Sequence, residues 1–240
     1  MAQALKRIEL YFGTKKLEQI IDHTICIIGL GGVGGSLALA LARSGFKRLI
    51  IIDNDIVSES NINRQMVANY NTLNMLKTSV LAKMIKEVNT EAEVITIDQF
   101  INEDNINLLD TYKIDFMCDC IDSVASKFSI LKYCHRHKIP LIASMGMGNR
   151  SDLSKLKIMK LEQTSIDPLA KALRLRARRE RVRWGRVICS SEYPLKQKQI
   201  VNPDGVSRKE KMPPSSLAHV VNGAGLMMAG YVINELASSK

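Results

Sequence analysis

The stretch that decides the fold is Thr24-Ile25-Cys26-Ile27-Ile28-Gly29-Leu30-Gly31-Gly32-Val33-Gly34. A short apolar run, typical of a buried strand, leads directly into a glycine-rich turn, and an apolar helical pattern follows. Glycines at this point allow a tight turn and a close approach of the backbone to phosphate groups, while the start of a helix supplies free N–H groups. The pattern therefore predicts a strand at 24–28, a helix at about 32–44 and a nucleotide-binding turn between them.

The second predicted strand, at 48–52, ends in Asp53. An acidic side chain at this position is placed to accept hydrogen bonds from ribose hydroxyls. A glycine motif alone is a weak signal, but its position between a strand and a helix, with an acid after the next strand, makes it specific for nucleotides. A glycine turn without any ligand is the plain alternative, and this order of elements argues against it.

The rest of the chain alternates between strands and helices up to about residue 145. This alternation predicts an α/β fold, a Rossmann-like and mostly parallel sheet with helices on both faces. Beyond residue 145 we expect C-terminal antiparallel strands and a final helix, within a single domain of residues 1–240. The further strands are expected at 93–97, 114–118, 139–143, 155–161 and 187–189, and the further helices at 5–21, 75–88, 102–110, 124–137, 168–183 and 217–236.

The composition of the chain excludes several classes of protein. The chain has 240 residues, 46% of them hydrophobic and 24% charged, which is the ordinary globular range. The sequence has no signal peptide and no apolar run near the ~18 residues that a spanning helix needs, so we expect a cytoplasmic protein without a membrane span. Five cysteines with no CxxC pair exclude a tetra-cysteine zinc site and indicate buried thiols in a reducing compartment.

The positive charge is concentrated in one segment. Residues 171–211 hold 13 Lys and Arg against 4 Asp and Glu, within a chain whose net charge is +10. Such a segment can contact phosphates of a nucleic acid, although a solvated basic loop without a partner would have the same composition. The candidate nucleic-acid-binding residues, in a loop-rich region at about 165–215, are Lys171, Arg174, Arg176, Arg178, Arg179, Arg181 and Arg183.

The polar run Asp55–Gln65 separates redox chemistry from ATP chemistry. A dehydrogenase gains nothing from an Asn-x-x-Arg-Gln cluster directly beyond the ribose acid, whereas a phosphoryl or nucleotidyl transfer site does. Arg64 can form a forked contact with phosphate oxygens, Asn61 can donate to them, and Lys77 follows shortly. Asp122, after the fourth strand, stands where open parallel sheets place ligand residues, and its carboxylate can hold Mg²⁺. A plain surface charge is the alternative for each residue alone.

Together these motifs resemble the ubiquitin-activating-like adenylating superfamily (ThiF/MoeB/HesA type), which activates ubiquitin-like and sulfur-carrier proteins. Within it, the chain most resembles the tRNA threonylcarbamoyladenosine dehydratases, over roughly residues 5–237. The superfamily motifs are Arg7 to Gly13, Gly29 to Gly34, Asp53, the run Asp55–Gln65, Lys77 and Asp122-Ser123. The stretches that favour the dehydratase branch are 120–127, 138–142, 146–148, 167–174 and 190–192.

The resemblance implies ATP-dependent cyclisation of N6-threonylcarbamoyladenosine in tRNA to its hydantoin form, through an acyl-adenylate. It implies ATP and Mg²⁺ as cofactors, with room for a monovalent cation, and tRNA as the substrate. It also implies a homodimer in which Arg7 reaches the partner's ATP site, and a partner from a sulfur-transfer or cysteine desulfurase system. The catalytic residues would be Arg64, Lys77, Asp122 and Arg7; the nucleotide-binding residues would be Gly29, Gly31, Gly32, Gly34, Asp53, Asp55, Asn61, Arg64, Lys77 and Asp122, with Asp122 on the metal.

Two departures from the superfamily pattern matter. Sulfur-carrier activating enzymes usually have two CxxC zinc pairs and a reactive cysteine, and this chain has no such pairs. Cys189 lies in an apolar segment, so we predict that it belongs to the core. Three alternatives stay open: adenylation of the C-terminus of a ubiquitin-like sulfur carrier, a nucleotide-binding scaffold without turnover, and a nicotinamide oxidoreductase.

Overall fold

The computed structural model describes residues 3–182, 185–196 and 214–238. Its helices are α1 (Lys6–Phe12), α2 (Thr14–Ile21), α3 (Gly32–Arg43), α4 (Lys77–Val88), α5 (Val124–His137), α6 (Pro168–Glu180) and α7 (Ala218–Ser238). Its strands are β1 (Thr24–Ile28), β2 (Arg48–Ile52), β3 (Glu93–Ile97), β4 (Phe116–Asp119), β5 (Leu141–Ser144), β6 (Leu156–Lys160) and β7 (Arg186–Ser190). Among the described helices, none is long and apolar enough to cross a bilayer.

The strands form one sheet in the order β3-β2-β1-β4-β5-β7-β6. All neighbouring pairs are parallel except β6 and β7, which are antiparallel. The strand order reverses between β1 and β4, and in open α/β sheets such a switch point is where ligands bind. The register brings the end of β1, Ile28, beside Ile52 of β2 and Asp119 of β4. The predicted mostly parallel fold with a C-terminal antiparallel pair and a final helix is confirmed.

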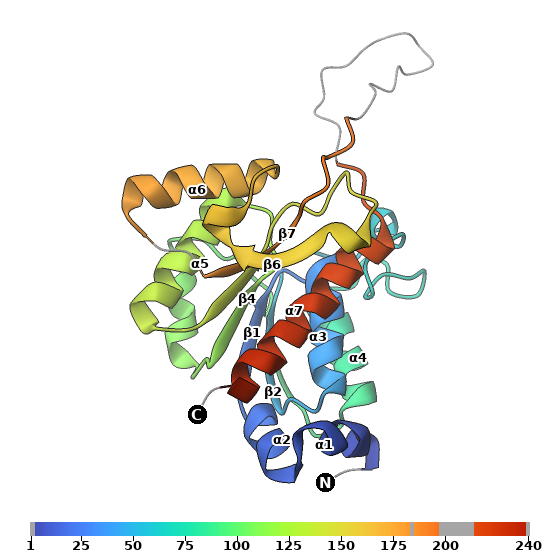
Figure 1. The fold of residues 1–240 in the computed structure, drawn as a ribbon. Coiled ribbons are helices and arrows are strands. Elements are labelled where there is room, and N and C mark those ends of the chain that lie inside the picture. Colours follow the sequence, from blue (N-terminus) through green and yellow to red (C-terminus); the bar gives the residue numbers. More distant parts are fainter. Residues whose placement is uncertain (1–2, 183–184, 197–213, 239–240) are drawn as a thin grey trace.

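Helices cover both faces of the sheet, as Figure 1 shows. Ile25 and Ile27 of β1 belong to the core on the side of α3, α4 and α7, whereas Cys26 and Ile28 belong to the core on the side of α5 and α6. This alternation follows from the period of two along a strand. Because both faces are covered, β1 and β4 are apolar except for Thr24 at the start of β1 and Asp119 at the end of β4, which explains the apolar run 25–28.

α7 packs closely along α3 (Figure 1). A Cβ atom at Gly225 would overlap the carbonyl oxygen of Val33, and one at Gly32 would overlap the side chain of Val221. The two helices can therefore approach only because glycines stand at these crossings. Asn222 of α7 is hydrogen-bonded to the hydroxyl of Ser36, and its Nδ2 donates to the carbonyl oxygen of Arg64 at 3.2 Å.

The strands predicted at 24–28 and 48–52 have the predicted bounds, as does the strand at 93–97. α4 begins at Lys77 rather than 75, because Leu76 is extended and forms a bridge with Ile56. The helix predicted at 168–183 ends at Glu180, because Arg181 adopts a left-handed conformation with φ 55°. The helix predicted at 102–110 is a 3-10 helix at Ile106–Thr111. Most of the predicted loop at 194–214 lies outside the described residues.

Candidate functional site

The glycine turn is held by its neighbours on the switch-point edge of the sheet. Gly29 has φ +89°, a conformation that favours glycine, and its N–H donates to the Ile52 carbonyl at 2.8 Å. A Cβ atom at Gly34 would overlap the carbonyl oxygen of Gly29, so the turn closes directly onto the first turn of α3. Gly31 is the N-cap of α3 and has no side chain to cover the free N–H groups there. This arrangement is suited to bind phosphates.

Asp53 links the turn to the segment that follows β2. Its Oδ2 accepts a hydrogen bond from the N–H of Leu30 at 2.6 Å, and its Oδ1 accepts one from the N–H of Asp55 at 2.8 Å. Each carboxylate oxygen has a second lone pair, so these bonds leave acceptor capacity for a ribose hydroxyl. Asp53 thus fixes the shape of the turn as well as standing where a ribose acid is expected.

Lys77 is buried at the start of α4, with its ammonium nitrogen 2.7 Å from Oδ2 of Asp55. The Lys77 side chain is 6% exposed, whereas that of Asp55 is 59% exposed. The chain between them folds back on itself, because the N–H of Lys77 also donates to the carbonyl of Asp55 at 3.1 Å. The predicted residues Asp55 and Lys77 therefore lie together just after β2. An anionic ligand can bind the Lys77 ammonium group, either in place of the Asp55 carboxylate or beside it.

Arg64 and Asn61 lie in the polar segment between β2 and α4. Nη1 of Arg64 donates to the carbonyl of Ser60 and to Oδ1 of Asn63, both at 2.8 Å. Nε and Nη2 of Arg64 donate to no residue in the described part of the chain, so they are available for phosphate oxygens. Asn61 is buried, and its Oδ1 accepts from the N–H of Ser58, so its role in the structure is to cap this segment.

Gln65 was not among the predicted site residues, although it ends the predicted run. Gln65 is 8% exposed, and its Oε1 accepts no hydrogen bond from any described residue. Its Nε2 would lie 3.7 Å from a Cβ atom at Gly31, so the amide stands beside the turn. A buried amide oxygen without a donor is costly, and a nucleotide bound at the turn can supply that donor. The burial of Gln65 beside Gly31 is what marks it as a site residue, and burial cannot be read from the sequence alone.

Asp122 lies in the loop 120–123 between β4 and α5, and its exposed carboxylate has no hydrogen-bond partner among the described residues. The loop packs on the turn, because a Cβ atom at Gly29 would come within 2.9 Å of the Cys120 carbonyl carbon and of Ile121 Cγ2. Ser123 caps α5 as predicted, accepting from the N–H of Ser126. No group of three metal ligands occurs among the described residues. One carboxylate fits Mg²⁺ that is held mainly by phosphates and water.

α1, the helix that contains Arg7, lies at the opposite end of α3 from the glycine turn (Figure 1). Leu5, just before α1, approaches Gly45, which follows the C-terminal end of α3, whereas the turn lies at the N-terminal end of α3. The 12 residues of α3 span about 18 Å, so the two ends are well separated. Arg7 is exposed, and the structure does not bring it to the glycine turn of its own chain.

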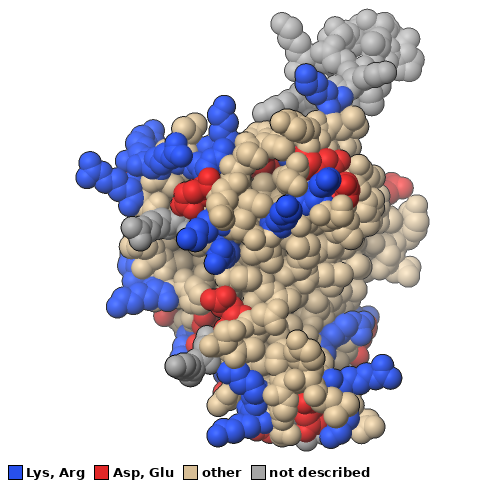
Figure 2. Space-filling model, in the orientation of Figure 1, with Lys and Arg blue, Asp and Glu red and all other residues tan. Residues whose placement is uncertain are grey.

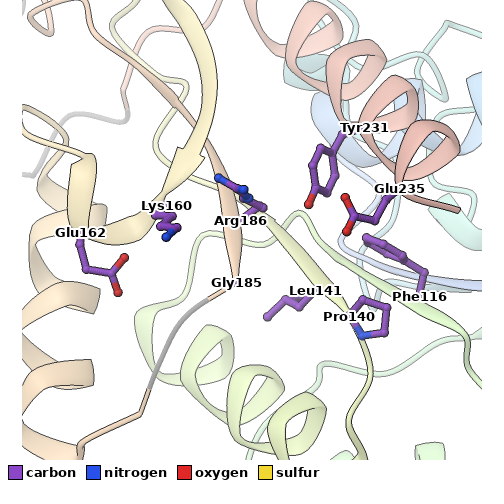
Figure 3. A pocket seen from close by; sticks show the side chains of 9 residues that line it. All are labelled: Phe116, Pro140, Leu141, Lys160, Glu162, Gly185, Arg186, Tyr231 and Glu235. Carbon is purple, nitrogen blue, oxygen red and sulfur yellow. The ribbon is translucent and has the colours of Figure 1, made fainter. Parts of the chain in front are cut away.

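A cavity of about 610 Å³ lies at the edge of the sheet away from the turn (Figure 3). Its cationic side chains, Lys160 and Arg186, are matched by Glu162 and Glu235. Burial raises the pKa of Tyr231 in its wall, and a hydrogen bond to Glu235 adds to the rise. The cavity is lined from the starts of β4, β5 and β7, away from the glycine turn and the free N–H groups at the start of α3, so it is not the candidate nucleotide site.

Basic side chains gather over α6, as Figure 2 shows. Lys171, Arg178, Arg179 and Arg181 are exposed there. Arg174 and Arg176 are half-buried: Arg174 donates to the hydroxyl of Thr164, while Arg176 pairs with Glu180 at 2.9 Å and lies over the ring of Phe128. Arg183 is outside the described residues. The predicted basic segment thus divides into exposed residues and residues that hold α6 on the domain.

Cys189 is buried in β7, as predicted. Burial raises the pKa of its thiol to about 12. A thiol that is covered and stays protonated is a poor nucleophile, so Cys189 is part of the core.

A doubly wound sheet with a glycine turn at its switch point and an acid after the next strand defines a nucleotide-binding α/β protein. The family model described as "ThiF family" matches residues 4–236. The chain therefore belongs to the ThiF family.

Two relatives and two solved structures show where it is similar within that family. The chain is 37% identical to the tRNA threonylcarbamoyladenosine dehydratase of Bacillus subtilis over 242 residues, covering 98% of this chain and 95% of the relative. It is 38% identical to the Escherichia coli enzyme of the same name over 165 residues, covering 69% and 62%. Crystal structures of that E. coli protein in complex with AMP and with ATP align with TM-scores of 0.87 and 0.86 at 28% identity. These alignments cover 98% of this chain, and 94% and 93% of the respective solved chains.

Proposed function

We propose that the chain is an ATP-dependent tRNA threonylcarbamoyladenosine dehydratase. The main support is the near full-length similarity to the B. subtilis enzyme of that name. The geometry agrees with it, because the glycine turn, Asp53, the Lys77–Asp55 pair and Asp122 gather on one edge of the sheet. ATP and tRNA occur together in the cytoplasm, where we place the enzyme.

The proposed reaction has two steps. The threonyl carboxylate of the substrate attacks the α-phosphate of ATP, a P–O bond forms, and pyrophosphate leaves with the electron pair of the broken P–O bond. A ureido nitrogen of the same side chain then attacks the acyl carbon, loses its proton, and AMP leaves as the hydantoin ring closes. Both groups of the second step belong to one molecule, so a high effective molarity drives it and no catalytic cysteine is needed.

The side chains of this chain supply positioning and charge. Lys77 would stabilise the negative charge that develops on the phosphates, together with the two guanidinium nitrogens of Arg64 that bond to no described residue. Bound Mg²⁺ would neutralise phosphate charge, and Asp122 is the residue that would hold it. Asp53 would orient the ribose.

The function is tested by mass spectrometry of digested nucleosides after incubation with ATP, Mg²⁺, K⁺ and tRNA that carries the modification. We expect the modified adenosine to lose one water, with one AMP and one pyrophosphate released per product. Unchanged nucleosides, together with AMP transfer to an added sulfur carrier, would favour the alternative of carrier activation. Neither turnover nor pyrophosphate exchange would leave only a nucleotide-binding scaffold.

Binding of tRNA through the exposed residues of α6 can be measured by its salt dependence. We propose that the double variant Arg178→Gln/Arg179→Gln loses two phosphate contacts. The slope of log K against log salt should then become shallower by about 1.5, since each neutralised phosphate contributes roughly 0.7–0.9. The matched variant Arg174→Gln/Arg176→Gln should lower the melting temperature and leave the slope near that of the wild type. Equal slopes for all three proteins would remove α6 from the tRNA interface.

The outer face of α7 supports a homodimer. Glu235 is the only Asp, Glu, Lys or Arg residue of this helix, Leu226 is 57% exposed, and a Cβ atom at Gly230 would meet nothing within 4 Å. A helix with so little charge on its outer face is normally covered by another surface, and Figure 2 shows a broad uncharged surface along it. If two copies pack here with antiparallel α7 helices, the edge that carries Arg7 lies beside the partner's nucleotide edge.

A mixing experiment tests this arrangement. Arg7→Ala and Asp122→Ala chains should each be inactive alone. After random exchange, their mixture should recover about a quarter of the wild-type activity, because half of the dimers then have one intact site of two. A mixture of Arg64→Ala and Asp122→Ala is the control; both changes affect sites of their own chains, so it should recover nothing. Absence of recovery in the first mixture, with exchange shown by tagged chains, would refute the shared site.

A further inference from the structure

We propose that the buried ion pair between Asp119 and Lys127 is a positioning pair for adenylation: it holds the loop 120–123, and with it Asp122, against the nucleotide turn. The proposal rests on the function proposed above. Asp119 is the last residue of β4, and Lys127 lies in the first turns of α5. Their side chains are 0% exposed, and Nζ of Lys127 lies 3.0 Å from Oδ1 of Asp119.

The pair anchors both ends of the loop. Oδ1 of Asp119 also accepts a hydrogen bond from the N–H of Ile121 at 3.2 Å, which fixes the loop where it leaves β4. At the other end, the backbone N–H of Lys127 closes the first turn of α5 onto the carbonyl of Ser123 at 2.9 Å, and the Lys127 side chain ties this turn to Asp119 at 3.0 Å. Asp122 stands between these two anchors. A shift of either partner would therefore move the carboxylate that is proposed to hold Mg²⁺.

The same loop supports the glycine turn. The N–H of Cys120 donates to the carbonyl of Ile28 at 2.8 Å, directly before Gly29. A Cβ atom at Gly34 would lie 3.2 Å from Cβ of Cys120, so the loop and the turn leave no slack between them. The ion pair, the loop and the turn thus form one continuous set of contacts from the core to the nucleotide edge.

A contribution to stability alone does not account for this pair. Burial raises the pKa of Asp119, and the charge of Lys127 opposes the rise. Oδ2 of Asp119 accepts no hydrogen bond from any described residue. A buried ion pair with an unsatisfied atom is often no more stable than apolar side chains of similar volume. Unlike apolar side chains, the ion pair fixes the position of α5 relative to the end of β4. Asp122, in the loop between these two elements, is placed only if that position is fixed.

The test replaces the whole pair by apolar residues in Asp119→Val/Lys127→Met, so that no unpaired charge is left buried. Calorimetry then compares ATP binding with Mg²⁺ and with EDTA. In the double variant, the gain in ATP affinity that Mg²⁺ provides should shrink by about tenfold, and kcat should fall by a similar factor, as for other residues that orient metal ligands. KM for tRNA should stay unchanged, and the single variant Lys127→Arg should retain most of the gain.

Lys132→Met is the matched control, because Lys132 lies on the same helix and pairs with Glu103 at the surface. It should leave the effect of Mg²⁺ on ATP binding as it is in the wild type. A folded double variant with the wild-type gain in ATP affinity and the wild-type kcat would overturn the proposal. If the double variant does not fold, the single variant Lys127→Arg decides: loss of the gain in a folded Lys127→Arg protein, which keeps the positive charge, would overturn it. Calorimetry needs no tRNA, so a wild-type protein that binds Mg²⁺-ATP but does not change the modified nucleoside would refute the proposed function alone.

Discussion

Replacing Arg64 or Asp122 by alanine is expected to lower kcat for the modified tRNA by about a thousandfold or more. Arg64 has guanidinium nitrogens free of partners among the described residues, and the carboxylate of Asp122 is exposed and unpaired there. Both would lose charge stabilisation that matters most in the transition state, so kcat should fall more than the affinity for ATP. Rapid-quench measurement of AMP release is the suitable assay.

Neither change should unfold the protein, because neither side chain is part of the core. Arg43→Ala is the control for loss of a positive charge, since Arg43 lies in the last turn of α3, at the far end of the helix from the turn. It should keep kcat and cost at most about 1 kcal/mol through its interaction with the helix end. Turnover of Arg64→Ala or Asp122→Ala within a few-fold of the wild type would remove that residue from the mechanism.

Gly34→Ala is expected to destroy nucleotide binding and to lower the free energy of unfolding by at least about 3 kcal/mol. The added methyl group would overlap the carbonyl oxygen of Gly29, which is backbone and cannot rotate away. The turn and the start of α3 would have to separate, and the phosphate-binding N–H groups would lose their geometry. Urea denaturation and calorimetry with ATP measure the two effects.

Gly35→Ala is a control one residue away in the same helix. Its Cβ atom would lie 3.5 Å from the Leu30 carbonyl oxygen, an ordinary contact. Alanine is a better helix former than glycine, so this variant should gain up to about 1 kcal/mol and bind ATP normally. Equal behaviour of the two alanine variants would show that the close approach at Gly34 does not exist in solution.

The fold was largely predictable because its signals are local. The apolar runs at 24–28 and 48–52, each followed by glycine or acid, give strand bounds that match the structure. The start of α4 was not predictable in the same way, since it depends on the bridge between Leu76 and Ile56 across a long loop. Such contacts are set by tertiary structure, and helical periodicity does not contain them.

The candidate site was predictable where residue type and order carry the chemistry, as for Asp53 and Lys77. It was not predictable where a charged residue is used inside the protein. Lys127 and Arg150 look like surface residues in the sequence, yet the Lys127 side chain is 0% exposed and Arg150 is 3% exposed, paired with Asp167 at 3.6 Å. Charged residues are so rarely buried that sequence reasoning places them in water unless a partner is known.

The packing of α7 on α3 has a consequence for how the protein is made. The glycine turn and α3 are synthesised early. The residues of α7 that pack on α3, Val221 and Gly225, and the residue that bonds to Arg64, Asn222, are synthesised long afterwards. A nascent chain that lacks α7 leaves one side of α3 in water, so we expect it to bind ATP poorly. ATP stabilises only chains that can bind it. Nucleotide binding would therefore favour molecules whose synthesis has reached this helix, and shield them from proteases.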